Sequence, residues 1–269
     1  PKAAPGPAAP AAAGPGTDAP GDGDSASPDG SGVTADRTGT SMTVVTGDQL
    51  RRQQIRHAAD ALRSLPGVTV GRTGGFGGLT QVRIRGAEGN HTLVLIDGIE
   101  ANPAVTGEFD FSNLGTDDID RIEVLKGPMS GLYGTGAVGG VINIVTLSGK
   151  GPLTLRARAE TGAFSTSDLA ASVSGGSERA HGALSVARRS TNGFNISPFG
   201  NEDDHASITT VAAKAGFIPM DGVALDFTLR NVRRTGGRDG DGGPAGQLAT
   251  QVDTPSFFAS SLFLAGINL

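Results

Sequence analysis

The second half of the chain is dominated by segments in which apolar and polar residues alternate. Leu153, Leu155, Ala157 and Ala159 occupy every other position of one such segment. A period of two places one set of side chains on each face of a β-strand. The segments are about 9–12 residues long, which suits strands that cross a membrane. The pattern predicts six antiparallel strands, at 153–161, 167–175, 181–190, 207–217, 223–232 and 256–267.

The connections between these segments alternate in length. Those at 175–180 and 218–222 are tight, whereas those at 190–206 and 233–255 are long. Short turns on one side and long loops on the other are typical of outer-membrane β-barrels. If the first strand runs outward, both long loops are extracellular. Because an open sheet in hydrocarbon would leave unpaired backbone groups at its edges, six strands predict an incomplete barrel.

Residues 33–146 contain shorter elements of mixed type. A helix is predicted to begin with the capping box Thr46-x-x-Gln49 and to end at Pro66-Gly67. Its apolar face is formed by Leu50, Ile55, Ala58, Leu62 and Leu65. Short strands are expected at 42–46, 67–71, 81–86, 92–98, from about 121, and at 141–146.

A second short helix is expected near residue 116. Thr116 is its predicted N-cap, and Asp117 and Asp118 lie in its first turn, where the helix dipole favours acids. Together with the short strands, the two helices predict a small α+β domain.

The first 32 residues differ in composition from the rest of the chain. Residues 1–32 are rich in Pro, Ala and Gly, followed by Asp and Ser. Such a segment buries too little apolar surface to offset the entropy of ordering. We therefore expect a disordered leader.

Composition also excludes several classes of protein. The 269 residues include no Cys, so the chain has no disulfide framework and no cysteine zinc site. The net charge of −5 argues against a nucleic-acid-binding face. No run of about 20 apolar residues predicts a transmembrane helix. The histidines lack the spacing of metal ligands and are expected at the surface: His57, His91, His181 and His205.

The stretch Gly134-x-Gly136-x-x-Gly139 matches the glycine pattern of dinucleotide-binding loops. In such a loop a helix follows the glycines and holds a pyrophosphate at its N-terminus. Here residues 141–146, VINIVT, are β-branched at nearly every position and predict a strand. We therefore expect turn and close-packing glycines. No catalytic constellation accompanies them, so the chain is not expected to be an enzyme.

Several separate blocks carry a resemblance to a known family. These are LRSLPGVTV, QVRIRG, TLVLIDGI and IDRIEVLKGPMSGLYGTGAVGGVINIVT, in this order. The chain resembles the TonB-dependent outer-membrane receptors, most closely those of the cobalamin-receptor type. The resemblance implies a plug domain at 38–148 and the N-terminal part of a transmembrane β-barrel at 149–269. The segment VTADR, at 33–37, resembles the TonB box, although few residues separate it from the first strand.

The resemblance implies import of a scarce nutrient complex, cobalamin or a ferric siderophore, across the bacterial outer membrane. The implied partner is TonB, whose periplasmic domain would pair with Val33, Thr34, Ala35, Asp36 and Arg37 as an added strand. The implied ligand-facing plug residues are Thr73, Gly74, Gly75, Phe76, Asn102, Pro103 and Phe109. Arg85, Glu123 and Lys126 are candidates for polar contacts between plug and barrel. No cofactor is required.

The predicted extracellular loops carry acidic residues that suit one metal. Asp203, Asp204, Asp239 and Asp241 lie in these loops, and clustered carboxylates are ligands for Ca²⁺, which receptors of this type use. The alternative is a solvated acidic loop. A second alternative concerns function: a non-transporting binding or signalling protein of the outer membrane that keeps the plug. Signalling forms usually add a folded N-terminal domain, which the composition of 1–32 does not favour.

Overall fold

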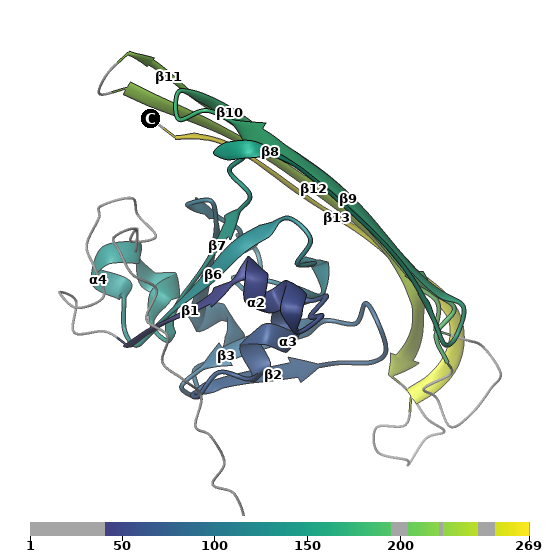
Figure 1. The fold of residues 1–269 in the computed structure, drawn as a ribbon. Helices are drawn as coiled ribbons and strands as arrows, with labels where there is room; N and C mark the ends of the chain where they lie inside the picture. The colour runs from purple at the N-terminus through teal and green to yellow at the C-terminus, as the bar shows by residue number, and fades with distance from the viewer. Residues whose placement is uncertain (1–40, 195–203, 221–222, 242–250, 269) are drawn as a thin grey trace, which may run out of the picture.

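A computed structural model of the chain shows a compact plug and a six-stranded sheet that curves past one side of it (Figure 1). It describes residues 41–194, 204–220, 223–241 and 251–268; at 238–241, 251–258 and 267–268 only the backbone is described. The plug comprises residues 41–146. Among the described residues, no helix is long and apolar enough to cross a membrane.

A five-stranded sheet forms the centre of the plug. Its order is β1-β6-β7-β4-β5. The bounds are β1 Ser41–Thr46, β4 Thr92–Ile96, β5 Ile99–Glu100, β6 Ile119–Lys126 and β7 Gly140–Thr146. Strands β4 and β7 are parallel, and the other pairs are antiparallel. The β-branched run that follows the glycine pattern is therefore a strand, and the expectation against a nucleotide loop is confirmed.

The predicted first helix is two helices, α2 (Gly47–Arg52) and α3 (Ala58–Arg63). The capping box is present: Gln49 Oε1 accepts from the Thr46 amide at 2.9 Å. The helix breaks because Gln54 adopts a φ of 54° and His57 forms a β-bridge with Gly115. Backbone pairing with a distant segment thus outweighs continuous helical periodicity.

The expected helix at Thr116 is wrong. Residues 116–118 form a turn into β6, and the Thr116 hydroxyl donates to the Ile55 carbonyl at 2.7 Å. This hydroxyl caps the break between α2 and α3 rather than a helix of its own. In the described part of the chain, the remaining helical elements are α4 (Ser130–Tyr133) and three 3₁₀ turns, Gly89–His91, Phe111–Asn113 and Thr135–Ala137.

The plug core lies between the central sheet, the helices and the hairpin formed by β2 (Val68–Arg72) and β3 (Thr80–Ile84). Its fully buried side chains include Leu50, Leu62, Ile84, Ile122 and Ile142. Leu264, on the last strand of the second sheet, belongs to the same apolar cluster. The plug and the second sheet therefore share buried apolar surface.

The second sheet, which we call the barrel sheet, has the predicted six antiparallel strands. They are β8 Gly151–Gly162, β9 Thr166–Gly176, β10 Ala180–Thr191, β11 Ala206–Met220, β12 Val223–Asp241 and β13 Gln251–Asn268. Each pairs with the next along the chain. Most of the expected loop 233–255 is strand, because β12 and β13 extend past the alternating segments and pair as far as Asp241 and Gln251.

The two faces of the barrel sheet differ in polarity. The outer face exposes large apolar side chains, including Leu153, Leu155, Leu184, Leu229 and Phe263. The inner face, toward the plug, carries most of the charged residues of these strands. The alternation in the sequence therefore separates a lipid-facing surface from a plug-facing one.

Two glycines at the start of β7 are required by close packing. Gly140 has a φ of 153°, and a Cβ there would lie 2.3 Å from the Leu125 carbonyl oxygen. A Cβ on Gly139 would lie 2.8 Å from Ala87 Cβ. Gly139 and Gly140 thus let segments approach closely inside the plug.

We predict that Gly140→Ala destabilises the plug by on the order of 2 kcal/mol or more, because the new methyl group meets backbone that cannot move aside. Hydrogen–deuterium exchange of β6 and β7 amides should accelerate at least about 10-fold. Gly71→Ala is the matched control, since a Cβ there meets no atom within 4 Å. Equal exchange in both variants would contradict the packing argument.

Candidate functional site at the interface of plug and barrel sheet

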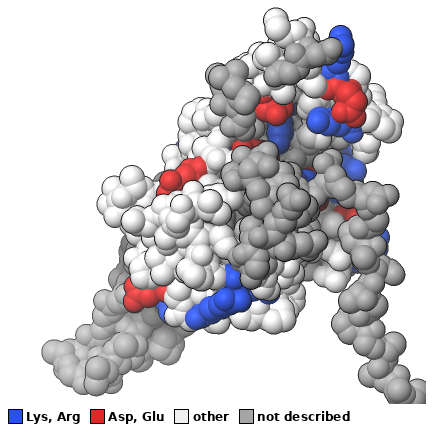
Figure 2. All heavy atoms as spheres, turned by 90° about the vertical axis from the view of Figure 1, so that its left-hand side faces the viewer, with Lys and Arg blue, Asp and Glu red and all other residues white. Residues whose placement is uncertain are grey.

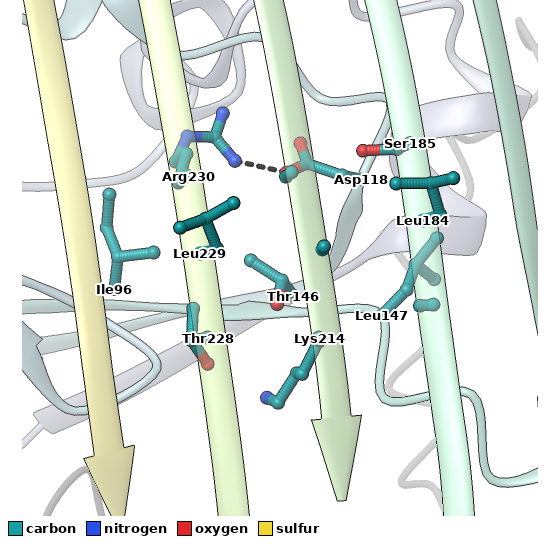
Figure 3. A pocket seen from close by; sticks show the side chains of 13 residues that line it. Ile96, Asp118, Thr146, Leu147, Leu184, Ser185, Lys214, Thr228, Leu229 and Arg230 are labelled. Carbon is teal, nitrogen blue, oxygen red and sulfur yellow. Dashed lines mark hydrogen bonds and ion pairs between the residues drawn. The ribbon is translucent and has the colours of Figure 1, made fainter.

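The interface is centred on a buried ion pair between the two parts. Arg230 on β12 is 1% exposed and donates from Nη1 to Asp118 Oδ2 of the plug (Figure 3). Asp118 is also buried, at 4%. Because neither charge reaches bulk water, each depends on the other for compensation.

A second pair lies beside the first. Lys214 Nζ on β11 donates to Asp97 Oδ1 at 2.6 Å. Asp97 has a φ of 51° in the turn after β4 and also accepts from the amide and the hydroxyl of Thr146, at 3.0 and 2.6 Å. One carboxylate thus connects the turn after β4, the end of β7 and the barrel sheet.

Arg234 on β12 holds the loop of the β2–β3 hairpin. Its Nη1 donates to Asp110 Oδ2 at 2.7 Å, to the Gly77 carbonyl at 2.8 Å and to the Ser112 hydroxyl. Asp110 Oδ1 accepts in turn from the amides of Thr80 and Ser112, both at 3.0 Å. The loop at 71–80 is thereby fixed against the inner face of the barrel sheet.

Two ion pairs join the plug to β8. In one the arginine is on β8, and in the other it is in the plug. Arg158 on β8 donates to Asp117 Oδ1 at 2.7 Å, and Arg56 of the plug donates from Nε to Glu160 Oε2 on β8 at 3.1 Å. Burial raises the pKa of Asp117, more than the Arg158 guanidinium lowers it. A cavity of about 480 Å³ lies beside these pairs and is lined in part by Arg156.

Arg189 on β10 contacts both an aromatic ring and a histidine of the plug. Its guanidinium lies 4.7 Å from the ring centroid of Phe76, and Nη1 lies 2.9 Å from His57 Nε2. Burial, followed by the charge of Arg189, lowers the pKa of His57 to about 4. His57 is therefore neutral at pH 7, and its Nε2 accepts a hydrogen bond from the guanidinium.

A cavity of about 180 Å³ opens next to Phe76, at the end of the barrel sheet that carries the β10–β11 connection. Its walls include Phe164, Phe194 and Thr191, and Arg189 contributes a cation. The rings of Phe164 and Phe194 lie 5.4 Å apart. Aromatic faces and one guanidinium can hold a ligand that combines planar groups with negative charge.

The structure separates the predicted ligand-facing residues into two groups. Thr73, Gly74 and Pro103 are exposed, and Gly75 and Phe76 line the cavity just described. They remain candidates for ligand contact.

Two predicted ligand-facing residues are structural instead. Phe109 is 3% exposed and packs edge-on against Phe111 in the plug core. Asn102 is bonded to three backbone groups, those of Thr92, Val94 and Gly107, at 2.7–3.0 Å. Both side chains serve the plug fold, so their prediction as ligand contacts is corrected.

Two of the three predicted polar contacts between plug and barrel, those of Glu123 and Lys126, are also corrected. Glu123 accepts from Arg121 Nε at 2.6 Å and from Asn143 Nδ2 at 2.9 Å, both within the plug. Lys126 donates to the Pro66 carbonyl at 3.1 Å, again within the plug. Arg85 is exposed, with a φ of 53° after the end of β3, and its contact with the barrel stays a prediction.

The actual contacts with the plug were missed by sequence reasoning. They come from barrel-sheet residues at plug-facing positions, Arg158, Arg189, Lys214, Arg230 and Arg234. These basic residues occupy inner positions of the alternating pattern, so their orientation could be predicted from the sequence. Their partners in the plug lie in turns, where no periodic pattern of residues predicts which way a side chain points.

Two further predictions fall largely outside the described residues. Residues 33–37, the proposed TonB box, are among them, as are Asp203 and the side chains of Asp239 and Asp241. Asp204 is described and is 8% exposed. Within the described part of the chain, no group of three side chains is arranged to hold a metal ion.

Figure 2 shows the face of the molecule on the α4 side. Uncharged residues predominate among its described atoms, and Lys and Arg lie in small groups with acidic side chains among them. The described part of this face therefore presents no continuous basic surface for a phosphate backbone.

We predict that Arg230→Ala destabilises the docked plug by about 3–5 kcal/mol, because Asp118 would remain buried without a counter-charge. Arg51→Ala is the control: it removes an exposed pair with Asp48, which should cost at most about 1 kcal/mol. Urea unfolding of the plug in the detergent-solubilised receptor measures both. Equal losses would show that burial of the Arg230 pair does not matter.

We also predict that docking weakens as pH falls from about 6.5 to about 4. Unfolded His57 binds a proton in this window while docked His57 does not, so the stability present above pH 6.5 is progressively lost. Urea midpoints between pH 7.5 and 5 should show the trend before most carboxylates titrate. His57→Gln should flatten the profile; an unchanged slope would contradict the assignment.

Comparison with known proteins agrees with this geometry. The sequence model of the family described as TonB-dependent Receptor Plug Domain matches residues 34–141. A vitamin B12 transporter, BtuB of Photobacterium profundum, is 35% identical over 178 residues, which are 65% of this chain and 29% of that protein.

Solved structures show the same fold. The siderophore receptor PirA of Acinetobacter baumannii aligns with a TM-score of 0.59 at 21% identity, over 73% of this chain and 32% of that one. The ferric-catecholate import receptor Fiu of E. coli K12 aligns with a TM-score of 0.59 at 22% identity, over 75% and 28%. The chain thus spans about a third of the proteins it matches. Residues 34–141 thus belong to the TonB-dependent receptor plug domain family, and a partial barrel of antiparallel strands follows them.

Proposed function

We propose that the protein is a receptor for energy-coupled import of a scarce nutrient complex, cobalamin or a ferric siderophore. The observation that carries this proposal is the docking of the plug: charged residues fix it against a barrel sheet at several points. A plug held by separable polar contacts can block a barrel at rest and still be displaced. No bond to the ligand has to be made or broken.

Energy coupling is assigned to residues 33–37, which resemble the TonB box. They precede β1, which is an edge strand of the plug sheet because it pairs only with β6 in the described part of the chain. In our proposal TonB pairs with the box as an added strand and pulls on β1. Since β1 is half-exposed at most positions, its removal disturbs little of the buried core.

The ligand is proposed to bind at the cavity beside Phe76, under the extracellular loops. Phe164, Phe194 and Arg189 supply rings and a cation there. The relative with 35% identity is a vitamin B12 transporter, which supports cobalamin. Receptors with similar folds are described as siderophore receptors, which supports a ferric siderophore. Calcium bound by Asp203, Asp204, Asp239 and Asp241 remains a proposal for the same loops.

The proposal is tested with the full-length receptor. We expect either cyanocobalamin or a ferric catecholate siderophore to bind with micromolar or tighter affinity in isothermal titration calorimetry. Phe76→Ala should weaken binding at least about 10-fold, because it removes a ring from the cavity wall. Leu153→Ala on the outer face is the control. Titration with and without Ca²⁺ tests the metal. If neither ligand class bound, the proposed substrate range would be wrong.

Transport is tested separately from binding. Deletion of residues 33–37 should abolish capture of the receptor by the TonB C-terminal domain and abolish uptake, while ligand affinity stays the same. Deletion of residues 10–14 in the leader is the control. Binding without any TonB capture by the intact chain would favour the non-transporting receptor instead.

A further inference from the structure

The outer face of the barrel sheet carries two arginines among apolar residues. Side chains at alternate strand positions face outward, and Arg188 on β10 and Arg233 on β12 hold such positions and are exposed. Along the described strand residues 151–191, 206–220, 223–237 and 259–266, they are the only charged residues that the alternation places on this face. A charged side chain that faces lipid is costly unless it lies near the membrane surface or is paired with an opposite charge.

The two arginines lie in one row across the sheet. Arg188 is directly opposite Thr209 of β11, and Thr209 is directly opposite Arg233. Opposite residues of antiparallel strands point to the same face. The two arginines are thus two strand spacings apart, about 10 Å, with a hydroxyl between them. Arginine side chains are long enough for both guanidinium groups to approach one group above Thr209.

Each arginine is the outer member of an Arg-Arg pair. The inner members are Arg189, which binds His57 at 2.9 Å, and Arg234, which binds Asp110 at 2.7 Å. Among the described residues, no hydrogen bond or ion pair is recorded for Arg188 or for Arg233. The inner charges are satisfied by the plug, and the outer charges face away from it.

The depth of the row is set by its neighbours. The row on one side contains Val186, Val211 and Phe263, with Asn231 between the last two, and apolar rows follow beyond it. The row on the other side contains Ser190 and Ser207. Strands of such barrels are tilted by about 40° from the barrel axis. The segment from Ala180, at the far end of β10, to Arg188 therefore spans about 20 Å along that axis. The arginines therefore stand at one edge of an apolar band of about 25 Å.

This edge is the extracellular one. Strand β8 follows the plug directly, so it begins on the periplasmic side and the β10–β11 connection lies outside. Arg188 is near that end of β10, and Arg233 lies in the same row of the sheet, although β12 extends eight residues further. We propose that Arg188, Thr209 and Arg233 form a binding site for the phosphate group of an anionic lipid in the outer leaflet. The site rests on the outer-membrane placement of the sheet and is independent of the imported ligand.

Arginine chemistry favours phosphate as the occupant. A guanidinium donates two parallel hydrogen bonds to phosphate oxygens, and its charge is weakly hydrated and suited to an interface. The Thr209 hydroxyl adds a third donor. Phosphate at the membrane edge also allows the acyl chains of the lipid to pack on Val186, Val211 and Phe263 below it.

The test uses the full-length receptor in detergent and a double variant, Arg188→Gln with Arg233→Gln. Native mass spectrometry measures binding of bisphosphorylated lipid A. We expect the double variant to bind it at least about 10-fold more weakly than the unaltered receptor. The control, Arg83→Gln with Lys150→Gln, removes two exposed charges elsewhere and should bind as the unaltered receptor does. Heat-modified gel mobility verifies that each variant forms a barrel.

Two further arms define the ligand. Dephosphorylated lipid A should bind equally weakly to the unaltered receptor and to the double variant, and 10 mM inorganic phosphate should not displace lipid A. Equal affinity of the double variant and the unaltered receptor for lipid A would overturn the proposal, as would equal binding of the two lipids. Displacement by inorganic phosphate would overturn the lipid as the source of the phosphate. Binding of the imported ligand should be unchanged in the double variant, so failure here is distinct from failure of the import proposal.

Discussion

The structure depends on the pairing of buried charges across the interface between the plug and the barrel sheet. Arg230 and Asp118 are each almost fully buried, one on each side of it. The desolvation of either charge alone would cost several kcal/mol, so neither part reaches a stable arrangement with this face open. Lys214 with Asp97 and Arg234 with Asp110 repeat the arrangement at two further points. The plug therefore completes the inner face of the sheet.

The alternation of apolar and polar residues in the barrel strands produces two different faces. Apolar residues such as Leu155 and Phe263 face outward, and basic residues of the same strands face the plug. Because polar pairs are directional and individually separable, they hold the plug in one register yet can be broken one after another. A continuous apolar interface would release the plug far less readily. This division of contacts links the strand pattern to the proposed import, in which TonB displaces part of the plug from its N-terminal edge.

Most secondary-structure elements could be predicted from the sequence, whereas most contacts between distant residues could not. Strand alternation located β8 to β13, and the β-branched run at 141–146 excluded a nucleotide loop, because both patterns follow from local geometry. The expected helix at Thr116 failed because its hydroxyl bonds to the Ile55 carbonyl, 61 residues earlier. Glu123 and Lys126 were predicted to reach the barrel, but the fold turns both into the plug. Phe109 was a core residue for the same reason: burial is decided by contacts that no local pattern contains.

The central claim, that the plug docks on the inner face of the barrel sheet in this register, is tested most directly by a disulfide between the two parts. The chain contains no cysteine, and Ile99 Cδ1 lies 2.2 Å from the position of a Cβ on Gly266. In the full-length receptor, Ile99→Cys with Gly266→Cys should form a disulfide under mild oxidation, detected as an altered gel mobility reversed by reductant. Ile99→Cys with Leu153→Cys, on the outer face, should not. Absence of the first crosslink, or equal formation of both, would contradict the docked arrangement.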